Sequence, residues 1–600
     1  MANKIPDDIP VPDAVEFSQN MAKVAEQSQR LVTEFLENQK SGTQGPVDPV
    51  NVGEAFMEMT RNMMAHPEKV VQAQMDLWQS YVELWQSTAQ RMLGKTDNAA
   101  APDAGKKRDK RFKDEEWNEN EIFNFIKESY LLTSAWMTET VGNVEGMDEK
   151  TAKKVDFYAR PFVDALSPSN FLMTNPVVLK ETLATNGQNL VKGLENVLKD
   201  LERGKGKLNI SMTDMDAFEV GRNVATTPGK VVMQTDLMQL IQYEPVTKQV
   251  HQRPLLISPP WINKYYILDL QPKNSFIKWC TEQGLTVFVM SWVNPDEKLS
   301  DKTFEDYMNE GILAALDGIE QATGEREVTA IGYCLGGTLM ATTLAYMGAI
   351  GDDRIKACTF FTAQVEFSEP GELGVFIDDE QLTHLEQMME EKGYLDGSEM
   401  ASSFNMLRAN DLIWSFVVNN YLMGKDPFPF DLLFWNSDAT RMPPKMHSFY
   451  LREMYQNNKL VQPGALKMNG VGIDLSNVKV PVYMQAGKDD HIAPYQSVFK
   501  ATKYFKGNTR FMLAGSGHIA GVVNPPEPQK YQYWTNDKRK KYDTADEWLA
   551  EATETPGSWW PDWIKWMGKH SGKKVPARVP GDGKLEVLED APGSYVKVRS

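Results

Sequence analysis

Cysteine is scarce in this sequence, and the few cysteines that occur are far apart. Cys280, Cys334 and Cys358 are the three cysteines among 600 residues, and no two of them form a CxxC pair. Disulfide frameworks and structural zinc sites need cysteines that are numerous or closely spaced. We therefore expect neither a disulfide framework nor a metal site, and a reducing compartment fits the sequence.

Long apolar runs are also missing. No window holds about 18 consecutive apolar residues, which is close to the length that crosses a bilayer as a helix. Residues 1–17 lack the basic start and the apolar stretch of a secretory signal. The sequence therefore predicts a cytosolic protein, and association with a surface is left open.

Basic residues do not exceed acidic ones. Lys and Arg total 64 against 82 Asp and Glu, for a net charge of −18, which disfavours general binding of polyanions such as nucleic acid. Hydrophobic residues make up 42% and charged residues 24%, close to the averages of globular proteins. A chain of this length is too long for one small domain, so we expect two or more structural units.

Residues 1–105 are predicted to form amphipathic helices followed by a linker at 94–105. Apolar or small residues recur there at steps of three and four, on one stripe of a helix: Val71, Met75, Trp78, Val82, Trp85, Ala89 and Met92. Either this stripe packs on the protein itself, or it meets a partner helix or an apolar surface. The basic run at 106–113 either is solvated or faces an anionic partner.

In the rest of the chain, a helical pattern gives way to a pattern that mixes strands and helices. Residues 106–230 read as a helical domain, and residues 231–600 alternate short β-rich runs with helical stretches. This alternation predicts an α/β domain with a mostly parallel sheet. The expected strands are 255–258, 286–290, 328–333, 358–362, 480–486 and 509–514. A helical, aromatic-rich insertion at about 365–475 is interpreted as a cap domain over the active site.

The sequence Gly332-Tyr333-Cys334-Leu335-Gly336-Gly337 lies between an expected strand and an expected helix. Glycine two positions before and after a central residue is typical of a nucleophile elbow, where larger side chains would collide with neighbouring elements. Cys334 would then project from the strand end near a helix N-terminus, which favours a thiolate. The alternative is an ordinary strand-to-helix turn with a buried cysteine.

Two later segments supply a base and an acid for Cys334. Asp490 follows the strand at 480–486, and His518 follows the strand at 509–514. Nucleophile, acid and histidine in this order, each after a strand, are typical of the α/β-hydrolase fold. His491 competes with His518 but is adjacent in sequence to the candidate acid, and Asp489 competes with Asp490. The sequence favours Cys334, Asp490 and His518.

The oxyanion hole of such a site takes one backbone N–H from the residue after the nucleophile and one from an earlier loop. Leu335 is the first candidate. The loop after the strand at 255–258 supplies the second, Trp261 or Ile262.

Several longer segments resemble class I poly(3-hydroxyalkanoate) synthases over roughly residues 110–600. The segments are GYCLGG, PPWINKYYILDLQP, VFVMSWVNP, NDLIWSFVVNNYLMGKDPFPFDLLFWNSDATRMP, GKDDHIAP, SGHIAGVVNPP, GSWWPDW and LEDAPGSYVKVR. The family's nucleophile, acid and histidine fall on Cys334, Asp490 and His518.

This resemblance implies an enzyme that polymerises (R)-3-hydroxyacyl-CoA thioesters, with 3-hydroxybutyryl-CoA as the leading substrate, and releases CoA. It implies a cytoplasmic homodimer on polyester granules, without metal or other cofactor. Within the insertion, Arg408, Asn410 and Trp435 are candidate substrate contacts, with structural roles as the alternative. The first hundred residues match the family's motifs poorly, and granule or partner contacts are the role expected of them.

Two other functions stay open on the sequence alone. A thioesterase or polyester depolymerase would use the same scaffold, although serine is the more usual nucleophile there. A non-catalytic granule-coating protein would use only the amphipathic helices of residues 1–105.

Overall fold

A computed structural model describes residues 12–41, 52–93, 109–204, 206, 208–538 and 540–599. The chain divides into two compact units. The helical unit comprises the described residues up to Asp214 together with Ser403–Phe428, and the sheet unit comprises Met215–Ser402 and the described residues from Pro429 onward. Part of the expected insertion thus belongs to the helical unit, and the expected domain boundaries at 105 and 230 stay predictions.

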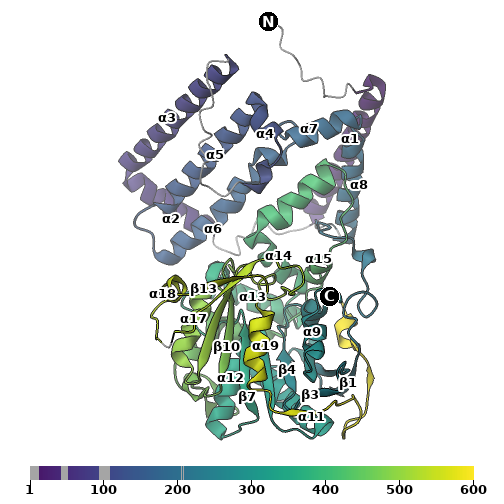
Figure 1. The fold of residues 1–600 in the computed structure, drawn as a ribbon. Helices are drawn as coiled ribbons and strands as arrows, with labels where there is room; N and C mark the ends of the chain where they lie inside the picture. Colours follow the sequence, from purple (N-terminus) through teal and green to yellow (C-terminus); the bar gives the residue numbers. More distant parts are fainter. Residues whose placement is uncertain are drawn as a thin grey trace. The chain divides into compact units, whose positions relative to one another are not determined.

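The helical unit is built from helices that pack side by side (Figure 1). They are α1 (Ala14–Ser41), α2 (Val52–Ala65), α3 (Pro67–Met92), α4 (Glu116–Glu119), α5 (Glu121–Gly142), α6 (Glu149–Ala165), α7 (Pro176–Ala184) and α8 (Gln188–Arg203). Helix α5 packs against both α3 and α6, and α1 packs against α8. Side-chain caps fix several starts; Asn120, for example, accepts the N–H groups of Ile122 and Phe123 at the start of α5.

Residues 403–428 complete the helical unit with two π-helical turns, Asn410–Trp414 and Val417–Leu422. They lie against α8, where Asn189 Nδ2 donates to the carbonyl of Leu422 at 2.8 Å. A Cβ atom at Gly193 would lie 1.8 Å from the carbonyl oxygen of Tyr421, so only glycine permits this approach. The green segment in Figure 1 lies among the purple and blue helices for this reason.

The apolar stripe of α3 faces away from its helical neighbours. The helix itself is confirmed, but Trp78 is 72% exposed and Trp85 is 66% exposed. Another side of α3 makes the packing contacts, and there Tyr81 donates to the carbonyl of Ser129 at 3.1 Å. The interpretation in which the stripe packs on the protein itself is wrong for these tryptophans. The expected linker at 94–105 lies outside the described residues.

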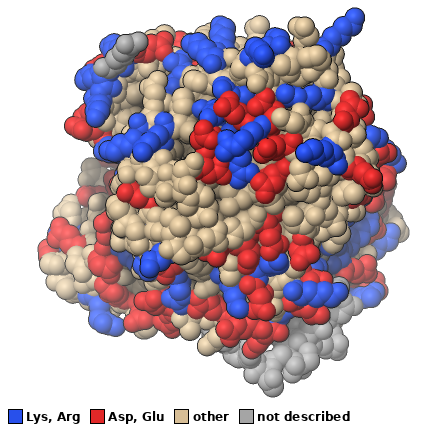
Figure 2. All heavy atoms as spheres, turned by 90° about the horizontal axis from the view of Figure 1, so that it is seen from below, with Lys and Arg blue, Asp and Glu red and all other residues tan. Residues whose placement is uncertain are grey.

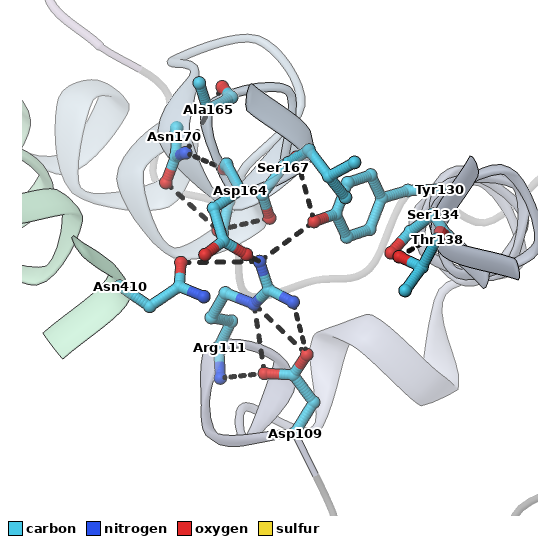
Figure 3. Close-up of polar contacts among 12 residues, drawn as sticks. Asp109, Arg111, Tyr130, Ser134, Thr138, Asp164, Ala165, Ser167, Asn170 and Asn410 are labelled. Carbon is cyan, nitrogen blue, oxygen red and sulfur yellow. Dashed lines mark hydrogen bonds and ion pairs between the residues drawn. The ribbon is translucent and has the colours of Figure 1, made fainter. Parts of the chain in front are cut away.

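Arg111, from the basic run, is half-buried in a polar network of the helical unit (Figure 3). Its guanidinium lies 2.7 Å from Asp109 and 3.1 Å from Asp164, and it donates to the hydroxyl of Tyr130 at 2.9 Å. Burial alone would lower the pKa of Arg111, but hydrogen bonding and the charge of Asp109 raise it. This arginine therefore ties chain segments together, while residues 106–108 lie outside the described part of the chain.

The sheet unit contains an eleven-stranded sheet in the order β13-β12-β11-β10-β7-β6-β4-β5-β2-β1-β15. Six neighbouring strands, from β11 to β5 in this order, are parallel, and they are the six expected from the sequence. Their bounds are β4 (Leu255–Ser258), β5 (Val287–Trp292), β6 (Val328–Tyr333), β7 (Ile355–Phe361), β10 (Val482–Gly487) and β11 (Thr509–Ala514). The predicted α/β fold class is confirmed.

Antiparallel strands that the sequence did not indicate extend both edges of this sheet. They are β1 (Gly229–Gln234), β2 (Met238–Tyr243), β12 (Gln532–Thr535), β13 (Thr553–Pro556) and β15 (Glu589–Asp590). Two small ribbons pair β3 (Gln249–His251) with β14 (Lys574–Pro576) and β8 (Lys467–Met468) with β9 (Val471–Gly472).

Helices cover both faces of the central strands, which is why these strands are buried on both sides. One core cluster contains Leu256 of β4 together with residues of helices α11 (Ala314–Thr323), α12 (Leu335–Ile350) and α17 (Tyr495–Tyr504). The other contains the neighbouring Leu255 and Ile257 with residues of helices α9 (Phe276–Glu282) and α19 (Trp560–Gly568). Because successive side chains of a strand point to opposite faces, these two clusters lie on opposite sides of the sheet.

The helices of the sheet unit are α9 (Phe276–Glu282), α10 (Phe304–Asp306), α11 (Ala314–Thr323), α12 (Leu335–Ile350), α13 (Asp379–Lys392), α15 (Asp431–Asn436), α16 (Pro444–Phe449), α17 (Tyr495–Tyr504), α18 (Ala545–Ala550) and α19 (Trp560–Gly568). Helix α14 (Gly397–Leu407) leads from this unit into the helical unit. The expected insertion is thus helical, and its role as a cap stays a prediction.

Basic and acidic side chains are interspersed on the face shown in Figure 2, with apolar and uncharged surface between them. No continuous basic strip runs across this view. Within the described ranges, every helix is too short or too polar to cross a bilayer.

Candidate active site

Cys334 lies at the sharp turn between β6 and α12. Its backbone has φ 51° and ψ −123°, in a region that residues other than glycine rarely adopt. The turn is held because the N–H of Cys334 donates to the carbonyl of Phe361 at 2.9 Å. On the other side, the carbonyl of Cys334 accepts the N–H groups of Gly337 and Thr338 at 2.8 and 3.1 Å. The structure thus has the strained elbow that the sequence predicts.

The two glycines of the motif are required by close contacts. A Cβ atom at Gly332 would lie 2.6 Å from the Cα of Gly337, across the turn. A Cβ atom at Gly336 would lie 2.3 Å from the carbonyl oxygen of Ser258, at the end of β4. A larger side chain at Gly332 would push β6 away from α12, and one at Gly336 would push the end of β4 away from α12.

The structure brings Cys334, His518 and Asp490 together at the carboxyl ends of β6, β11 and β10. His518 Nδ1 lies 2.8 Å from Asp490 Oδ2; the Asp490 side chain is fully buried and that of His518 is 10% exposed. The other carboxylate oxygen of Asp490 accepts the backbone N–H groups of Ile492 and Ala493, each at 2.9 Å. Because Asp490 occupies Nδ1, the remaining ring nitrogen of His518 is left for Cys334.

The environment of His518 favours its protonated form. Burial alone lowers the pKa of His518, but the charges of Asp490 and Cys334 and hydrogen bonds to both raise it well above its usual value. A histidine that holds a proton well in this position can take the proton of a cysteine thiol, which activates the sulfur for attack on an acyl group.

The competing residues have other surroundings. Asp489 is exposed, and the backbone carbonyl of His491 accepts the N–H of Glu372 at 3.3 Å. Cys280 and Cys358 are buried, and burial raises the pKa of both thiols well above the usual value. Among the cysteines, Cys334 alone combines partial exposure with a histidine neighbour.

The two expected sources of an oxyanion hole border this turn. Leu335 is the first residue of α12, whose leading N–H groups have no partner inside the helix. The loop after β4 carries Trp261 and Ile262, and no acceptor among the described residues takes the backbone N–H of either one. These N–H groups are therefore available to a ligand, as an oxyanion hole requires.

The three candidate substrate contacts have protein partners. Arg408 is paired with Asp411, and Asn410 joins the network of Arg111; both belong to the helical unit. Trp435 is buried in the sheet unit, and its indole N–H donates to the carbonyl of Lys264 at 2.7 Å. These contacts favour the structural alternative for all three residues.

Two tyrosines near Cys334 were not singled out from the sequence. Tyr450 and Tyr455 come from a π-helical turn at Tyr450–Gln456, and their ring centroids are 5.3 Å apart. Burial raises the pKa of both phenols, and the charge of Cys334 adds to the shift. The aromatic richness of the insertion was the only signal of them, and it did not distinguish these two residues from their neighbours.

A parallel sheet with a strained nucleophile elbow and a histidine and an acid after later strands defines a protein of the α/β-hydrolase fold. In agreement, the profile of the family described as "alpha/beta hydrolase fold" matches residues 267–525. The profile described as "Poly-beta-hydroxybutyrate polymerase (PhaC) N-terminus" matches residues 108–280.

Curated relatives match nearly the whole chain. The poly(3-hydroxyalkanoate) polymerase subunit PhaC of Rhizobium meliloti is 49% identical over 98% of this chain and 96% of its own length. The poly(3-hydroxyalkanoate) polymerase of Methylorubrum extorquens is 49% identical over 98% of each chain. The PhaC subunit of Cupriavidus necator is 39% identical over 94% of each. The chain belongs to the poly(3-hydroxyalkanoate) polymerases and is an acyltransferase, which excludes the non-catalytic alternative.

Proposed function

We propose that this enzyme polymerises (R)-3-hydroxyacyl-CoA thioesters, with 3-hydroxybutyryl-CoA as the leading substrate, through an acyl thioester on Cys334 and with release of CoA. The observation that carries the proposal is the hydrogen bond between His518 and Asp490 beside Cys334, at the elbow after β6. Family membership supports the polymer product.

Acylation exchanges one thioester for another. The proton of the Cys334 thiol goes to His518, the sulfur attacks the substrate carbonyl, and the bond from that carbonyl to the sulfur of CoA breaks. His518 then returns the proton to the departing CoA thiolate. The N–H groups of Leu335 and of Trp261 or Ile262 would stabilise the negative oxygen of the intermediate. Because both thioesters have similar energies, the acyl group stays activated for transfer.

Elongation uses the same base on a hydroxyl group. His518 takes the proton of the 3-hydroxyl of a second unit, and that oxygen attacks the carbonyl of the acyl-cysteine. The bond from the carbonyl to Cys334 Sγ breaks, an ester forms, and the proton returns to the sulfur. In both steps, Asp490 holds the imidazole ring of His518 in one orientation and stabilises the imidazolium that forms. Water must be excluded, since hydrolysis would end the chain.

Trapping the intermediate tests the proposal. After brief incubation with 3-hydroxybutyryl-CoA and an acid quench, peptide mass spectrometry should find the 3-hydroxybutyryl adduct on Cys334. The Cys334→Ala variant should form no adduct and no polymer, while Cys280→Ala, which alters a buried core thiol, should form both. Polymer made by folded Cys334→Ala would contradict the proposal.

The hydrolase alternative that the sequence alone left open predicts a different product. A thioesterase would convert 3-hydroxybutyryl-CoA to soluble 3-hydroxybutyrate, whereas a polymerase makes insoluble polyester. Measuring free acid and polymer in the same reaction separates the two, and free acid without polymer would reject the polymerase mechanism. Because hydrolysis needs water at the acyl-cysteine, the ratio of the products also reports how well the site excludes it.

We also propose cytoplasmic polyester granules as the location of the enzyme, with the stripe of α3 contacting the polymer surface. The exposed face of α3 presents Trp78, Trp85 and Met75, and large exposed apolar surfaces mark interaction sites. A polyester surface is uncharged, and the apolar stripe itself carries no charge.

Double substitution tests this contact. Trp78→Gln with Trp85→Gln should lower the fraction of enzyme that sediments with preformed polyester granules, with acylation of Cys334 unchanged. Gln79→Ala with Glu83→Ala, on polar exposed positions of the same helix, is the matched control. Equal sedimentation of both variants and the wild type would reject the contact. The homodimer implied by the family resemblance stays a prediction. Analytical ultracentrifugation would test it by measuring the mass of the enzyme in solution.

A further inference from the structure

The loop after β4 needs an external support. This loop, residues 259–264, is followed by a short 3₁₀ turn at Tyr265–Asp269 and includes no helix or strand. Its Trp261 and Ile262 have backbone N–H groups without acceptors in the described structure. An oxyanion hole stabilises a transition state only if its donors are held in place before the reaction. The position of this loop must therefore be fixed by contacts from outside it.

A segment distant in sequence, residues 435–440, supplies the backbone part of that support. The N–H of Thr440 donates to the carbonyl of Ile262 at 2.9 Å, and the hydroxyl of Thr440 donates to the carbonyl of Trp261. At the other end of the segment, the indole N–H of Trp435 donates to the carbonyl of Lys264 at 2.7 Å. The carbonyls of Trp261, Ile262 and Lys264 are thus used for attachment, and the N–H groups of Trp261 and Ile262 have no acceptor among the described residues.

A buried ion pair joins the same two segments. Lys264 Nζ lies 2.8 Å from Asp438 Oδ1, and the two side chains are only 2% and 1% exposed. The second carboxylate oxygen of Asp438 accepts the hydroxyl of Tyr266 at 2.9 Å. Burial lowers the pKa of Lys264 from its ordinary value, and the charge of Asp438 opposes that shift.

The ammonium of Lys264 also reaches a third segment. It donates to the carbonyl of Val598 at 2.7 Å, and Asn294, after β5, donates to the same carbonyl at 3.2 Å. The side-chain oxygen of Asn294 in turn accepts the backbone N–H of Arg441 at 2.9 Å. One lysine therefore sits where the loop after β4, the segment at 435–440 and the segment at 595–599 meet.

Stability alone is a weak reason for this arrangement. Replacing a buried ion pair by apolar side chains of similar size is often neutral or stabilising, whereas charges with fixed hydrogen-bond partners specify one geometry. We propose that Lys264, through Asp438 and the carbonyl of Val598, is a positioning residue that holds the N–H groups of Trp261 and Ile262 toward the acyl oxygen on Cys334. This inference rests on the proposed acyl-cysteine mechanism.

The test compares two reactions of the same sulfur. Acylation of Cys334 by 3-hydroxybutyryl-CoA creates an oxyanion, whereas alkylation of Cys334 by iodoacetamide does not. In the double variant Lys264→Met/Asp438→Asn, which leaves no unpaired buried charge, we expect single-turnover acylation to slow about 10-fold to 100-fold. Alkylation should stay within about twofold of the wild type, and KM should be unchanged while kcat falls.

A second pair of the sheet unit provides the matched control. Arg510 lies 2.9 Å from Asp562, which also accepts a tyrosine hydroxyl, that of Tyr483, at 2.9 Å. Arg510 is near the amino end of β11, whereas the catalytic residues follow the carboxyl ends of the strands. Arg510→Met/Asp562→Asn should therefore leave acylation and alkylation unchanged.

Each outcome decides the inference. Unchanged acylation in the folded double variant would overturn it, and so would an equal loss of acylation and alkylation, because that result indicates a disturbed elbow. If the double variant does not fold, Tyr266→Phe removes only one hydroxyl from Asp438 and should slow acylation a few-fold with alkylation unchanged; equal rates would overturn the inference. Failure of the proposed function is distinguishable, since the wild type would then show no acyl adduct on Cys334.

Discussion

Replacing Asp490 by asparagine keeps the shape of the side chain and removes its charge. With Asp490 Oδ2 at 2.8 Å from His518 Nδ1, Coulomb's law with an effective dielectric constant of about 20 gives an attraction of about 6 kcal/mol to the imidazolium. Burial of the ring offsets part of this attraction. In catalytic triads the same substitution lowers kcat about 10⁴-fold, or about 5 kcal/mol. We expect a loss of 10³-fold to 10⁴-fold in polymerisation by Asp490→Asn.

The assay follows CoA release with a thiol-reactive dye in the steady state, and acylation of Cys334 by mass spectrometry in a single turnover. Comparing the two shows how the loss divides between acylation and elongation. Asp489→Asn is the matched control, since that neighbouring carboxylate is exposed, and it should keep wild-type rates. Polymerisation by Asp490→Asn within tenfold of the wild type, or a larger loss in Asp489→Asn, would refute the assigned role.

Three further predictions concern the elbow and its surroundings. Gly336→Ala should lower the free energy of unfolding in urea by more than about 1–3 kcal/mol, because the added Cβ lies 2.3 Å from a backbone oxygen. Gly568→Ala is the control and should not lower it, because a Cβ at that position meets nothing within 4 Å. His518 takes up a proton on folding because its pKa is raised. The excess stability of the wild type over His518→Gln should therefore be largest below about pH 6.5 and shrink as the pH rises through the folded-state pKa; equal differences at pH 6 and pH 9 would contradict this. Tyr455→Phe should lower kcat a few-fold without changing the thermal midpoint, and an unchanged kcat would show that the hydroxyl takes no part.

The central sheet and the elbow were predictable because their signals are local. Short β-rich runs identified the six parallel strands, and glycines at fixed distances from Cys334 identified the turn. The antiparallel strands β1 and β2, which extend one side of the sheet, were not named individually. The fully buried β2 contains Gln239 and Gln242, whose polarity interrupts the apolar pattern. A buried glutamine is explained by contacts, such as those of Gln239 with Gln234 and Glu589, which no local pattern records.

The order of residues along the chain predicted the three catalytic residues of the site, but not the residues that surround them. Cys334, Asp490 and His518 each follow a strand, so the fold places them at one edge of the sheet. Lys264 and Asp438 gave no comparable signal, since charged residues are expected in solvent unless a partner distant in sequence is known. The contacts of Tyr450 and Tyr455 with the site depend likewise on how the insertion packs, which periodicity does not determine.

The attachment of residues 403–428 to α8 has a consequence for protein synthesis. Asn196 donates to the carbonyl of Asn420 at 3.1 Å, and Lys192 pairs with Asp426 at 2.7 Å. When α8 leaves the ribosome, the partners of these side chains have not yet been translated. The first unit to emerge thus cannot finish folding until the elbow and most of the strands around it have also been made. Nascent chains released before residue 428 should accordingly expose the surface of α8, including Gly193, to chaperones and proteases.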